Sequence, residues 1–483
     1  MNRMLTATIA MLVAATIAGA VETLPVEIEL PVAPVEIELD DCWIEVRLEA
    51  DATPSLRAEV TPGAEDGQAS LEISDRGGQV RIARTPAGDG ATPPTLTLEL
   101  VLDRTQSIQV RGTRLGVAVR DAASPEPTVA DAKPGTDGPS APVTVAGHRF
   151  ELTDSEVQLW GASAITVTGN NTVVYSENGV GAVVAELTLG SLTLRGHQGS
   201  LQLTSTDSES TVENLEGDIS FTLTGGSLDV RDGEGRIQGT SQGGMVATSG
   251  WEGDISVTGT EATVALREGR GGQAKIIAEN SNVTLDGMDG TFIIQLKGGQ
   301  LSADRLSGTA KISGSQSGQF SLQDSDGTLD LTLRDDSSGE VVDVAGTLNA
   351  QVADGRLDIS GAHIVNLTAE RSTVTVANIR RLAKLTVHRS EVDLDLREAQ
   401  DRALTLRVPD DIDITVDLPS PCRVQLQGGT GTSQGLDVSG CELQLEHLGR
   451  WKTAGRRDLE GRRPFLLTAT LAPTGQLKVR GGS

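Results

Sequence analysis

Hydrophobic and polar residues alternate in short runs along most of this chain, and the runs recur at a fixed interval. In the clearest copy, residues 218–235, Ile219 and Phe221 form one alternating run and Leu228 and Val230 form a second. Such alternation is typical of a β-strand with one buried face. A Gly-Gly-Ser turn separates the two runs, so each copy predicts two short strands joined by a tight turn.

Glycines close the successive copies at a nearly constant spacing. The interval from Gly217 to Gly235 is 18 residues and that from Gly308 to Gly327 is 19 residues. A fixed period of this length is the mark of a solenoid, in which each copy buries its apolar face against its neighbours. The complete set of closing glycines is Gly181, Gly199, Gly217, Gly235, Gly253, Gly271, Gly290, Gly308, Gly327 and Gly346.

We therefore predict an all-β fold, a parallel β-helix with one coil per copy and irregular β-rich caps at both ends. With Asp218 as repeat position 1, apolar residues favour positions 2, 4, 11 and 13. A further apolar residue often stands two residues before the closing glycine, which predicts a short third side. The aliphatic residue at every sixth position that left-handed hexapeptide helices need is absent, so we favour the right-handed form. The third-side residues are Leu215, Trp251, Met288, Leu306 and Val344.

The first 20 residues have the pattern of a secretory signal peptide. Arg3 precedes an apolar run over 5–17, and the small residues Ala18 and Ala20 suit a signal peptidase. We expect cleavage after Ala20 and export to the periplasm or the cell surface. No second long apolar run follows, so we expect no transmembrane anchor.

Four further segments follow from changes in the pattern. Residues 21–120 are β-rich without a strict period, and form either a small β domain or the first, irregular coils. Within them a duplicated Val-Glu-Ile-Glu-Leu, at 26–30 and 35–39, is either a flexible leader or an edge-pairing segment. Residues 121–142 are rich in proline, glycine and alanine and form a linker or a long excursion from a coil. The β-helix repeats occupy 143–400, and a C-terminal β cap occupies 401–483.

Two of the three cysteines lie one coil apart. Cys422 and Cys441 begin matching Cys-x-hydrophobic-x-Leu runs, and stacked strands bring equivalent Cα atoms about 4.8 Å apart. That spacing permits a disulfide, which we predict for an oxidising compartment. The alternative is two stacked free thiols in the core. Cys42 is left over, and we expect a structural role for it.

Charge and composition restrict the partners. The formal net charge is −27, which argues against binding to nucleic acid because a polyanion gains no counterion-release affinity for another polyanion. Aromatic residues make up only 2% of the chain, although sugar recognition commonly uses aromatic platforms. The core must therefore consist mainly of Val, Leu, Ile and Ala.

Candidate catalytic and metal-binding residues are scattered. A polysaccharide-degrading β-helix needs clustered carboxylates on one face, and several acidic pairs were considered for that role. We interpret them as solvated faces, the five histidines as exposed or turn residues, and the basic cluster as a solvated loop or a dock for an acidic surface. No catalytic, cofactor or metal site is therefore predicted. The acidic pairs are Asp324/Asp326, Asp335/Asp336, Asp393/Asp395 and Asp410/Asp411/Asp413; the histidines are His148, His197, His363, His388 and His447; the basic cluster is Arg450, Lys452, Arg456, Arg457, Arg462 and Arg463.

The chain resembles two related bacterial adhesin families, the auto-transporter adhesin head called the GIN domain and a β-strand-repeat domain of unknown function. The signal peptide, the opening Glu45-Val-Arg-Leu-Glu-Ala and coils such as 253–257 carry the resemblance, which covers most of the mature chain. It implies an exported β-repeat protein with an adhesin-like role and supplies no catalytic motif. The terminal residues 477–483 do not look like a barrel-terminating strand, which sets the chain apart from a true autotransporter.

Together these observations predict an exported, non-enzymatic β-helix protein of the bacterial cell envelope. Its repeat faces would bind a glycan or protein on the envelope or on a neighbouring cell. Two alternatives stay open at this point. One is a carbohydrate-active β-helix enzyme, a polysaccharide lyase or hydrolase, and the other is a purely structural envelope component.

Overall fold

The computed structural model describes the chain without interruption from residue 147 to residue 397. The predicted signal peptide and nearly all of the proline-rich segment lie outside the described residues. Every regular element of the described residues is a β-strand. The other described residues are 26–30, 34–40, 42–50, 52–61, 70–75, 80–85, 95–104, 106–121, 403–408, 413–418, 422–427, 436–439, 442–447, 450–454, 465–471 and 476–481.

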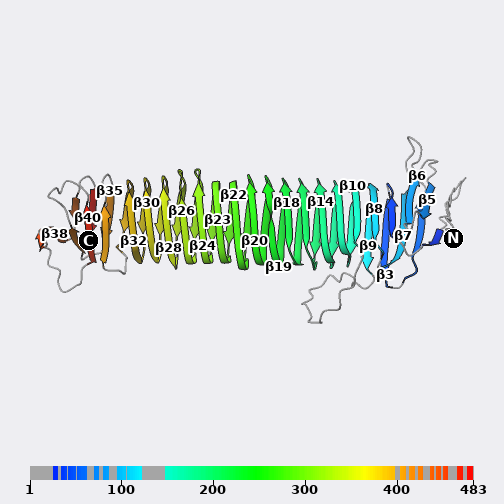
Figure 1. The fold of residues 1–483 in the computed structure, drawn as a ribbon, viewed down its shortest axis with the longest axis horizontal. Helices are drawn as coiled ribbons and strands as arrows, with labels where there is room; N and C mark the ends of the chain where they lie inside the picture. Colours follow the sequence, from blue (N-terminus) through cyan, green and yellow to red (C-terminus); the bar gives the residue numbers. More distant parts are fainter. Residues whose placement is uncertain are drawn as a thin grey trace, which may run out of the picture. The chain divides into compact units, whose positions relative to one another are not determined.

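Parallel strands 18 residues apart form a β-solenoid of about 14 turns, as predicted. β16 (Leu201–Thr206) pairs in parallel with β18 (Ile219–Thr224), and β17 (Glu209–Glu216) pairs with β19 (Ser227–Gln242). Each coil thus adds one strand to a first sheet and one strand to a second sheet (Figure 1). A short third side, marked by the parallel bridge between Gln198 and Glu216, leads to the next coil.

The contacts divide the chain into two compact units, Met1–Thr240 and Ser241–Ser483, which are described separately. In unit 1, consecutive coils run from β8–β9 to β18–β19. The remaining strands of unit 1 are β1 (Val26–Glu29), β2 (Val35–Glu38), β3 (Cys42–Glu49), β4 (Ser55–Thr61), β5 (Ser70–Asp75), β6 (Val80–Thr85), β7 (Thr95–Asp103), β8 (Ile108–Thr113), β9 (Gly116–Asp121), β10 (His148–Thr153), β11 (Glu156–Trp160), β12 (Ser163–Asn170), β13 (Val173–Glu177), β14 (Val180–Thr188) and β15 (Ser191–Arg195).

In unit 2, the regular coils run from β20 to β33, and several strands continue through the third side into the next coil. The strands are β20 (Met245–Thr260), β21 (Thr263–Arg267), β22 (Arg270–Asp286), β23 (Asp289–Asp304), β24 (Ser307–Ser315), β25 (Gln319–Gln323), β26 (Asp326–Leu333), β27 (Ser338–Val342), β28 (Thr347–Ala353), β29 (Arg356–Ser360), β30 (Ile364–Glu370), β31 (Thr373–Ala377), β32 (Arg381–His388) and β33 (Glu391–Asp395). Eight further strands follow: β34 (Ala403–Val408), β35 (Asp413–Leu418), β36 (Cys422–Gln427), β37 (Leu436–Ser439), β38 (Glu442–His447), β39 (Arg450–Ala454), β40 (Phe465–Leu471) and β41 (Gln476–Gly481).

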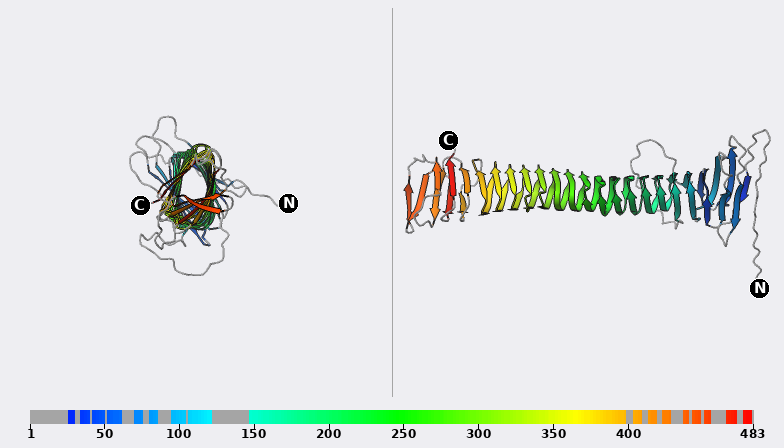
Figure 2. Two further views of the ribbon diagram at one scale, coloured as in Figure 1. Left: turned by 90° about the vertical axis from the view of Figure 1, so that its left-hand side faces the viewer. Right: turned by 90° about the horizontal axis from the view of Figure 1, so that it is seen from above.

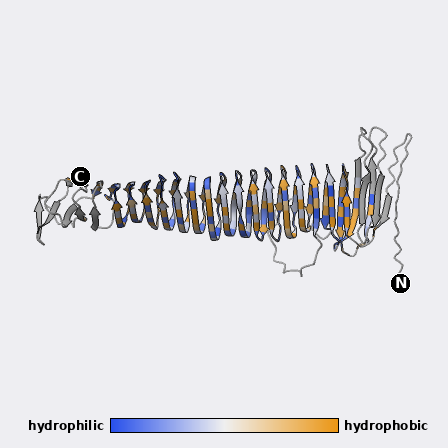
Figure 3. Ribbon diagram, turned by 45° about the horizontal axis from the view of Figure 1, so that its top comes forward, coloured by the Kyte–Doolittle hydropathy of each residue, from blue (hydrophilic) through white to orange (hydrophobic). Residues whose placement is uncertain are grey.

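The interior of each unit is filled by columns of equivalent apolar side chains. Ile219, Phe221, Leu228 and Val230 are each at most 4% exposed. The alternation of hydrophobic and hydrophilic residues along the strands is visible in Figure 3, and Figure 2 shows strands of successive coils side by side within each unit. The five predicted third-side residues are likewise buried, so a third apolar column completes the core: Leu215, Trp251, Met288, Leu306 and Val344.

Small residues at repeat position 9 close the first corner from the inside, a feature that the sequence analysis did not identify. The buried Ser208 donates its hydroxyl to the carbonyl oxygen of Thr206 (2.9 Å) and accepts the backbone N–H of Gly190 in the preceding coil (3.1 Å). Ser281 makes the same two bonds, to Glu279 and from Ala262. A buried serine therefore satisfies a backbone donor that the corner removes from the sheet ladder.

The closing glycines lie directly under one another where coils approach most closely. A Cβ atom on Gly199 or Gly217 would lie closer than 3.0 Å to the carbonyl oxygen of the closing glycine before it. In the next copies the glycine in this position is Gly272, since a Cβ there would lie 2.5 Å from the carbonyl group of Gly253. The sequence predicted Gly271 as the closing glycine of this coil. Gly271 instead lies where the register of β20 and β22 shifts to accommodate one extra residue, and a Cβ there would meet open space.

The two neighbouring glycines provide a direct test of this register. Gly272→Ala should destabilise unit 2 by several kcal/mol, about 3 or more, because a Cβ would overlap the backbone of Gly253 and φ is +78°. Gly271→Ala has a similar φ of +66° without the overlap and should cost only about 1 kcal/mol. Thermal and denaturant unfolding of both variants would measure the difference. Equal destabilisation would contradict the close approach at Gly272.

The N-terminal strands form the first coils of the solenoid in an order that differs from the sequence. β3 pairs in parallel with both β7 and β9, and β2 pairs with both β6 and β8. The coil β2–β3 therefore lies between coils β6–β7 and β8–β9. Antiparallel strands β4, β1 and β5 cover the outer side. The first Val-Glu-Ile-Glu copy is thus an edge strand, β1, while the second copy, β2, is an interior strand.

The C-terminal end has the same kind of rearrangement. β41 pairs in parallel with β35 and β37, and β40 pairs with β34 and β36, so the last two strands lie between earlier coils. Antiparallel β39 covers β38. Arg423 pairs with Glu442, which is the register that the proposed disulfide requires. Cys441 and the side chain of Cys422 lie outside the described residues, so the disulfide stays a prediction. The side chains of the basic cluster lie outside them as well.

Candidate functional site

Aromatic side chains gather on one outer surface of unit 1. The chain has ten aromatic residues; the side chains of Trp451 and Phe465 lie outside the description, which leaves eight. Three of the eight, Trp43, Trp160 and Tyr175, lie on the outer face of the second sheet, on β3, β11 and β13. The other five are in the core: Phe150, Phe221, Trp251, Phe292 and Phe320.

The Trp43 side chain packs over the neighbouring coil because that coil offers a glycine. The register pairs Trp43 with Gly116, and a Cβ on Gly116 would lie closer than 3.0 Å to Cε3 of the indole ring. The indole therefore occupies the space of the missing side chain. The indole is 37% exposed, less than Met245, Val173, Val180 and Leu189.

A ladder of two aromatic rings between two arginines crosses the next coils. The guanidinium carbon of Arg120 lies 4.6 Å from the centroid of the Trp160 ring. The Trp160 and Tyr175 rings are 6.4 Å apart and tilted by 55°, and Arg195 lies 5.9 Å from the Tyr175 centroid. Each exposed cation–π contact contributes about 0.5–1 kcal/mol, so the ladder also stabilises the sheet. We refer to Trp43, Arg120, Trp160, Tyr175 and Arg195 as the aromatic face.

Polar groups between the rings are held in place by neighbouring side chains. The Tyr175 hydroxyl donates to Glu177 (2.9 Å), and partial burial together with that carboxylate raises the pKa of Tyr175. The phenol therefore stays protonated at neutral pH. Arg195 pairs with Glu213 at 2.9 Å. The face thus offers flat apolar rings beside ordered donors and acceptors, an arrangement that suits recognition of a polar ring such as a sugar.

The acidic pairs considered as catalytic candidates do not form one cluster. Asp324, Asp335 and Asp336 have φ values of 49°, 53° and 62°, so they are corner residues in the left-handed conformation that Asp tolerates. Asp395 on β33 is held by Arg397, whose hydrogen bond lowers the pKa of the carboxyl group. Asp410 and Asp411 lie outside the described residues, and Asp413 begins β35. Within the part of the chain that is described, no three His, Cys, Asp or Glu side chains are grouped to hold a metal ion.

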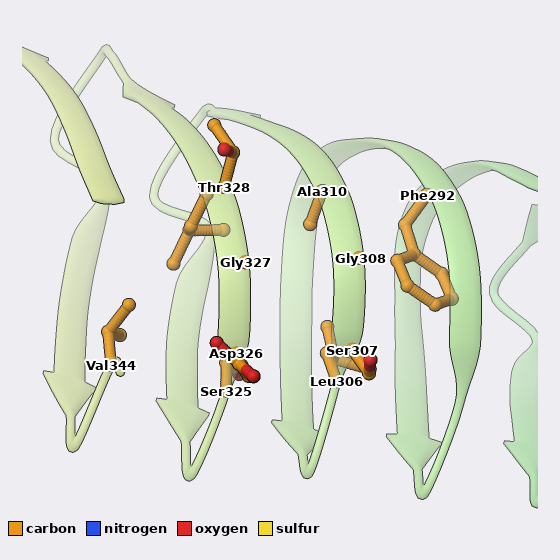
Figure 4. A pocket seen from close by; sticks show the side chains of 11 residues that line it. Phe292, Leu306, Ser307, Gly308, Ala310, Ser325, Asp326, Gly327, Thr328 and Val344 are labelled. Atoms are coloured by element: carbon orange, nitrogen blue, oxygen red, sulfur yellow. The ribbon is translucent and has the colours of Figure 1, made fainter. Parts of the chain in front are cut away.

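A small pocket in unit 2 offers no catalytic pair either. Its walls come from the packing columns of neighbouring coils, including Phe292, Leu306 and Val344 (Figure 4). Asp326 is its one lining carboxylate. A hydrolase or lyase would need a second acid or a base beside it. We therefore regard this pocket as a packing defect between coils.

Two histidines contradict the expectation of exposed or turn positions. His148 and His197 are each 1% exposed, because they occupy inward repeat positions. His148 pairs with Ile165 in the aliphatic column, and neither of its ring nitrogens has a hydrogen-bond partner. His197 stands two residues before Gly199, and its Nε2 contacts the carbonyl oxygen of Gly181 at 2.8 Å. Gly179 makes room for it, since a Cβ there would overlap the imidazole.

The comparisons with known proteins add little. No protein-family model and no curated protein matches this chain. A crystal structure at 1.95 Å resolution, described as a "putative cell adhesion protein" from Clostridium sporogenes, aligns with 53% of this chain and 100% of its own. The identity is 6% and the TM-score 0.16, so this likeness carries no argument here. The resemblance to the adhesin families therefore stays a prediction. A search of the described residues finds no helix of the length and apolarity that a membrane crossing requires.

Burial of His148 makes the stability of unit 1 depend on pH. Burial lowers the pKa of His148 from 6.5 to about 4, so the unfolded chain binds the proton more readily than the folded chain. The neutral side chain is fully tolerated above pH 6.5, and stability falls as the pH drops from 6.5 towards 4. The loss at pH 4 should be about 3 kcal/mol. Burial lowers the pKa of His197 as well, and so acts in the same direction.

Denaturant unfolding at pH 7.5 and pH 4.5 would measure this effect. His148→Leu should remove most of the pH dependence. His388→Gln, at an exposed position, should leave it unchanged. A wild-type stability that is equal at the two pH values would contradict the burial of a neutral imidazole.

Proposed function

We propose that this chain is an exported, non-enzymatic, adhesin-like protein of the bacterial cell envelope. In this proposal it binds glycans or proteins through its solenoid faces, and the aromatic face of unit 1 is the main contact surface. The export signal rests on the N-terminal sequence pattern. The binding role rests on the structure of the second sheet.

The observation that carries the proposal is the position of the outward aromatic residues. In a chain with 2% aromatic residues, the three described aromatic side chains outside the core all lie on one sheet face of one unit. The Trp43 ring lies over Gly116 and is 37% exposed, so part of the indole is open to a ligand. A flat β-sheet with ordered polar groups suits an extended ligand, such as a polysaccharide chain or a strand of protein.

The two alternatives receive less support from the described residues. An enzyme of the polysaccharide lyase or hydrolase class needs clustered acidic groups in a cleft, whereas Asp324, Asp335 and Asp336 are corner residues and Asp395 is paired with Arg397. A purely structural role does not explain why the three described aromatic side chains outside the core all lie on one sheet face of unit 1. The Arg120–Trp160 contact alone would suit either role, because it also stabilises the sheet.

An array of glycans and matrix proteins tests the proposal. The full chain should bind at least one glycan class, and the double variant Trp43→Ser, Trp160→Ser should bind it about tenfold more weakly or worse, because each lost ring contact costs about 1 kcal/mol. The matched control is Met245→Ser, which removes an exposed hydrophobic residue from the second sheet of unit 2. Circular dichroism and thermal unfolding would show that the variants remain folded.

Three results would count against the proposal. Binding that survives in the double variant would place the contact surface elsewhere. Absence of binding to any glycan or protein on the array would favour the structural alternative. Release of shorter sugars from a bound polysaccharide would show an enzyme.

A further inference from the structure

Two arginines on the aromatic face lie directly opposite each other on neighbouring strands. Arg47 on β3 pairs in register with Arg120 on β9. Like charges in this position repel and destabilise a sheet. The positive charge of Arg47 is compensated by two carboxylates: its Nη2 lies 3.2 Å from Oε1 of Glu99, and its Nε lies 3.7 Å from Oε1 of Glu45.

Arg120 has no such compensation. It is exposed, its guanidinium lies over the Trp160 ring, and no carboxylate of the described residues comes within 4.0 Å of it. Other described arginines also lack an acidic partner, but Arg120 combines this with an aromatic ring beneath its guanidinium and a second arginine opposite it. The geometry leaves a planar guanidinium beside an aromatic ring and open to an external anion.

We propose that the aromatic face binds a glycan that carries carboxylate groups, that is, a chain of uronic-acid sugars. This inference rests on the proposed function and specifies its ligand. A sugar carboxylate would accept the paired N–H groups of Arg120. The pyranose ring that bears it would pack against Trp160 and Tyr175. The small residues Gly116 and Ala118 of β9 separate this position from Trp43, which would receive a sugar farther along the same chain.

Spacing along β9 supports a ligand several sugars long. Gly116, under the Trp43 ring, and Arg120 are four residues apart, which corresponds to about 13 Å of strand. Ala118 between them is 3% exposed and presents only a methyl group. A ligand that contacts both Trp43 and Arg120 must therefore be extended along the strand, as an oligosaccharide is.

The net charge of −27 does not prevent binding of an acidic glycan at this position. Charges farther away than about 8 Å are largely screened at physiological ionic strength. Within the face, Arg47 is paired with Glu99 and Arg195 with Glu213, whereas Arg120 lies over the Trp160 ring, so the positive charge closest to an incoming carboxylate there is that of Arg120. A single carboxylate placed on Arg120 meets attraction there, and the distant acidic residues mainly slow the approach.

Isothermal titration with three probes tests this inference: an oligogalacturonate, the same oligosaccharide with its carboxyl groups reduced to alcohols, and a sulfated galactose oligosaccharide. We expect the oligogalacturonate to bind and its reduced form to bind about 10- to 100-fold more weakly, the value of one charged hydrogen-bonded contact. Arg120→Gln should weaken oligogalacturonate binding by a similar factor and leave binding of the reduced form unchanged. Arg267→Gln is the matched control, because Arg267 is an exposed arginine of the second sheet in unit 2 with no aromatic neighbour in register.

The outcomes separate this inference from the proposed function. Equal binding of the charged and reduced oligosaccharides, lost in Trp160→Leu and kept in Arg120→Gln, would overturn the carboxylate specificity and leave a glycan-binding face. Stronger binding of the sulfated probe than of the uronate would overturn it in favour of a sulfated ligand. Binding of the oligogalacturonate that is unaffected by both Arg120→Gln and Trp160→Leu would contradict both the inference and the assignment of this face.

Discussion

The structure depends on the close stacking of equivalent residues from one coil to the next. Neighbouring strands in a sheet are about 4.8 Å apart, so each inward side chain is covered above and below by its counterparts. The third-side column, at repeat position 16, shows how strict this stacking constraint is. The column accepts His197 only because Gly179 precedes it, and accepts Met288 beside Gly269, where a Cβ would overlap the methionine side chain. Large residues in one coil require small residues in the next, as close packing demands.

The same constraint shapes the outer surface. A side chain that lies over its neighbour needs space, and Gly116 gives Trp43 that space. Stacking also turns single residues into rows, so that Arg120, Trp160 and Tyr175 from three successive coils form one continuous surface. A solenoid can therefore build an extended binding face from few aromatic residues. The ends have a different arrangement. At each end a terminal coil lies between two others and antiparallel strands lie outermost, which hinders another parallel coil from adding to the stack.

Much of the fold could be predicted from the sequence. The period of 18 or 19 residues and the alternation within each copy gave the parallel solenoid, its two main strands and its third side. The order of the terminal coils could not be predicted. Strands such as β3 and β41 have the same alternating pattern whether they pair with their neighbours in the sequence or with distant coils. The place of the extra residue at Gly271 was also ambiguous, since Gly271 and Gly272 are adjacent and both fit the pattern.

The candidate site was harder to predict than the fold. The scarcity of aromatic residues is evident from the sequence, but scarcity alone does not indicate which of them point outwards. Trp160 at repeat position 14 and Tyr175 at position 12 fall on outward positions, and His197 falls on an inward one. The repeat register alone therefore predicts the orientation of these three side chains. The contact of Trp43 with Gly116 was not accessible, because it depends on the rearranged first coils.

Hydrogen exchange measured with and without oligogalacturonate tests the central claim most directly, since it locates a bound ligand on the chain. The account predicts slower exchange in peptides that cover β3, β9, β11 and β13, and unchanged exchange in peptides of unit 2. Protection confined to unit 2, or to the terminal strands, would contradict the assignment of the aromatic face as the binding surface.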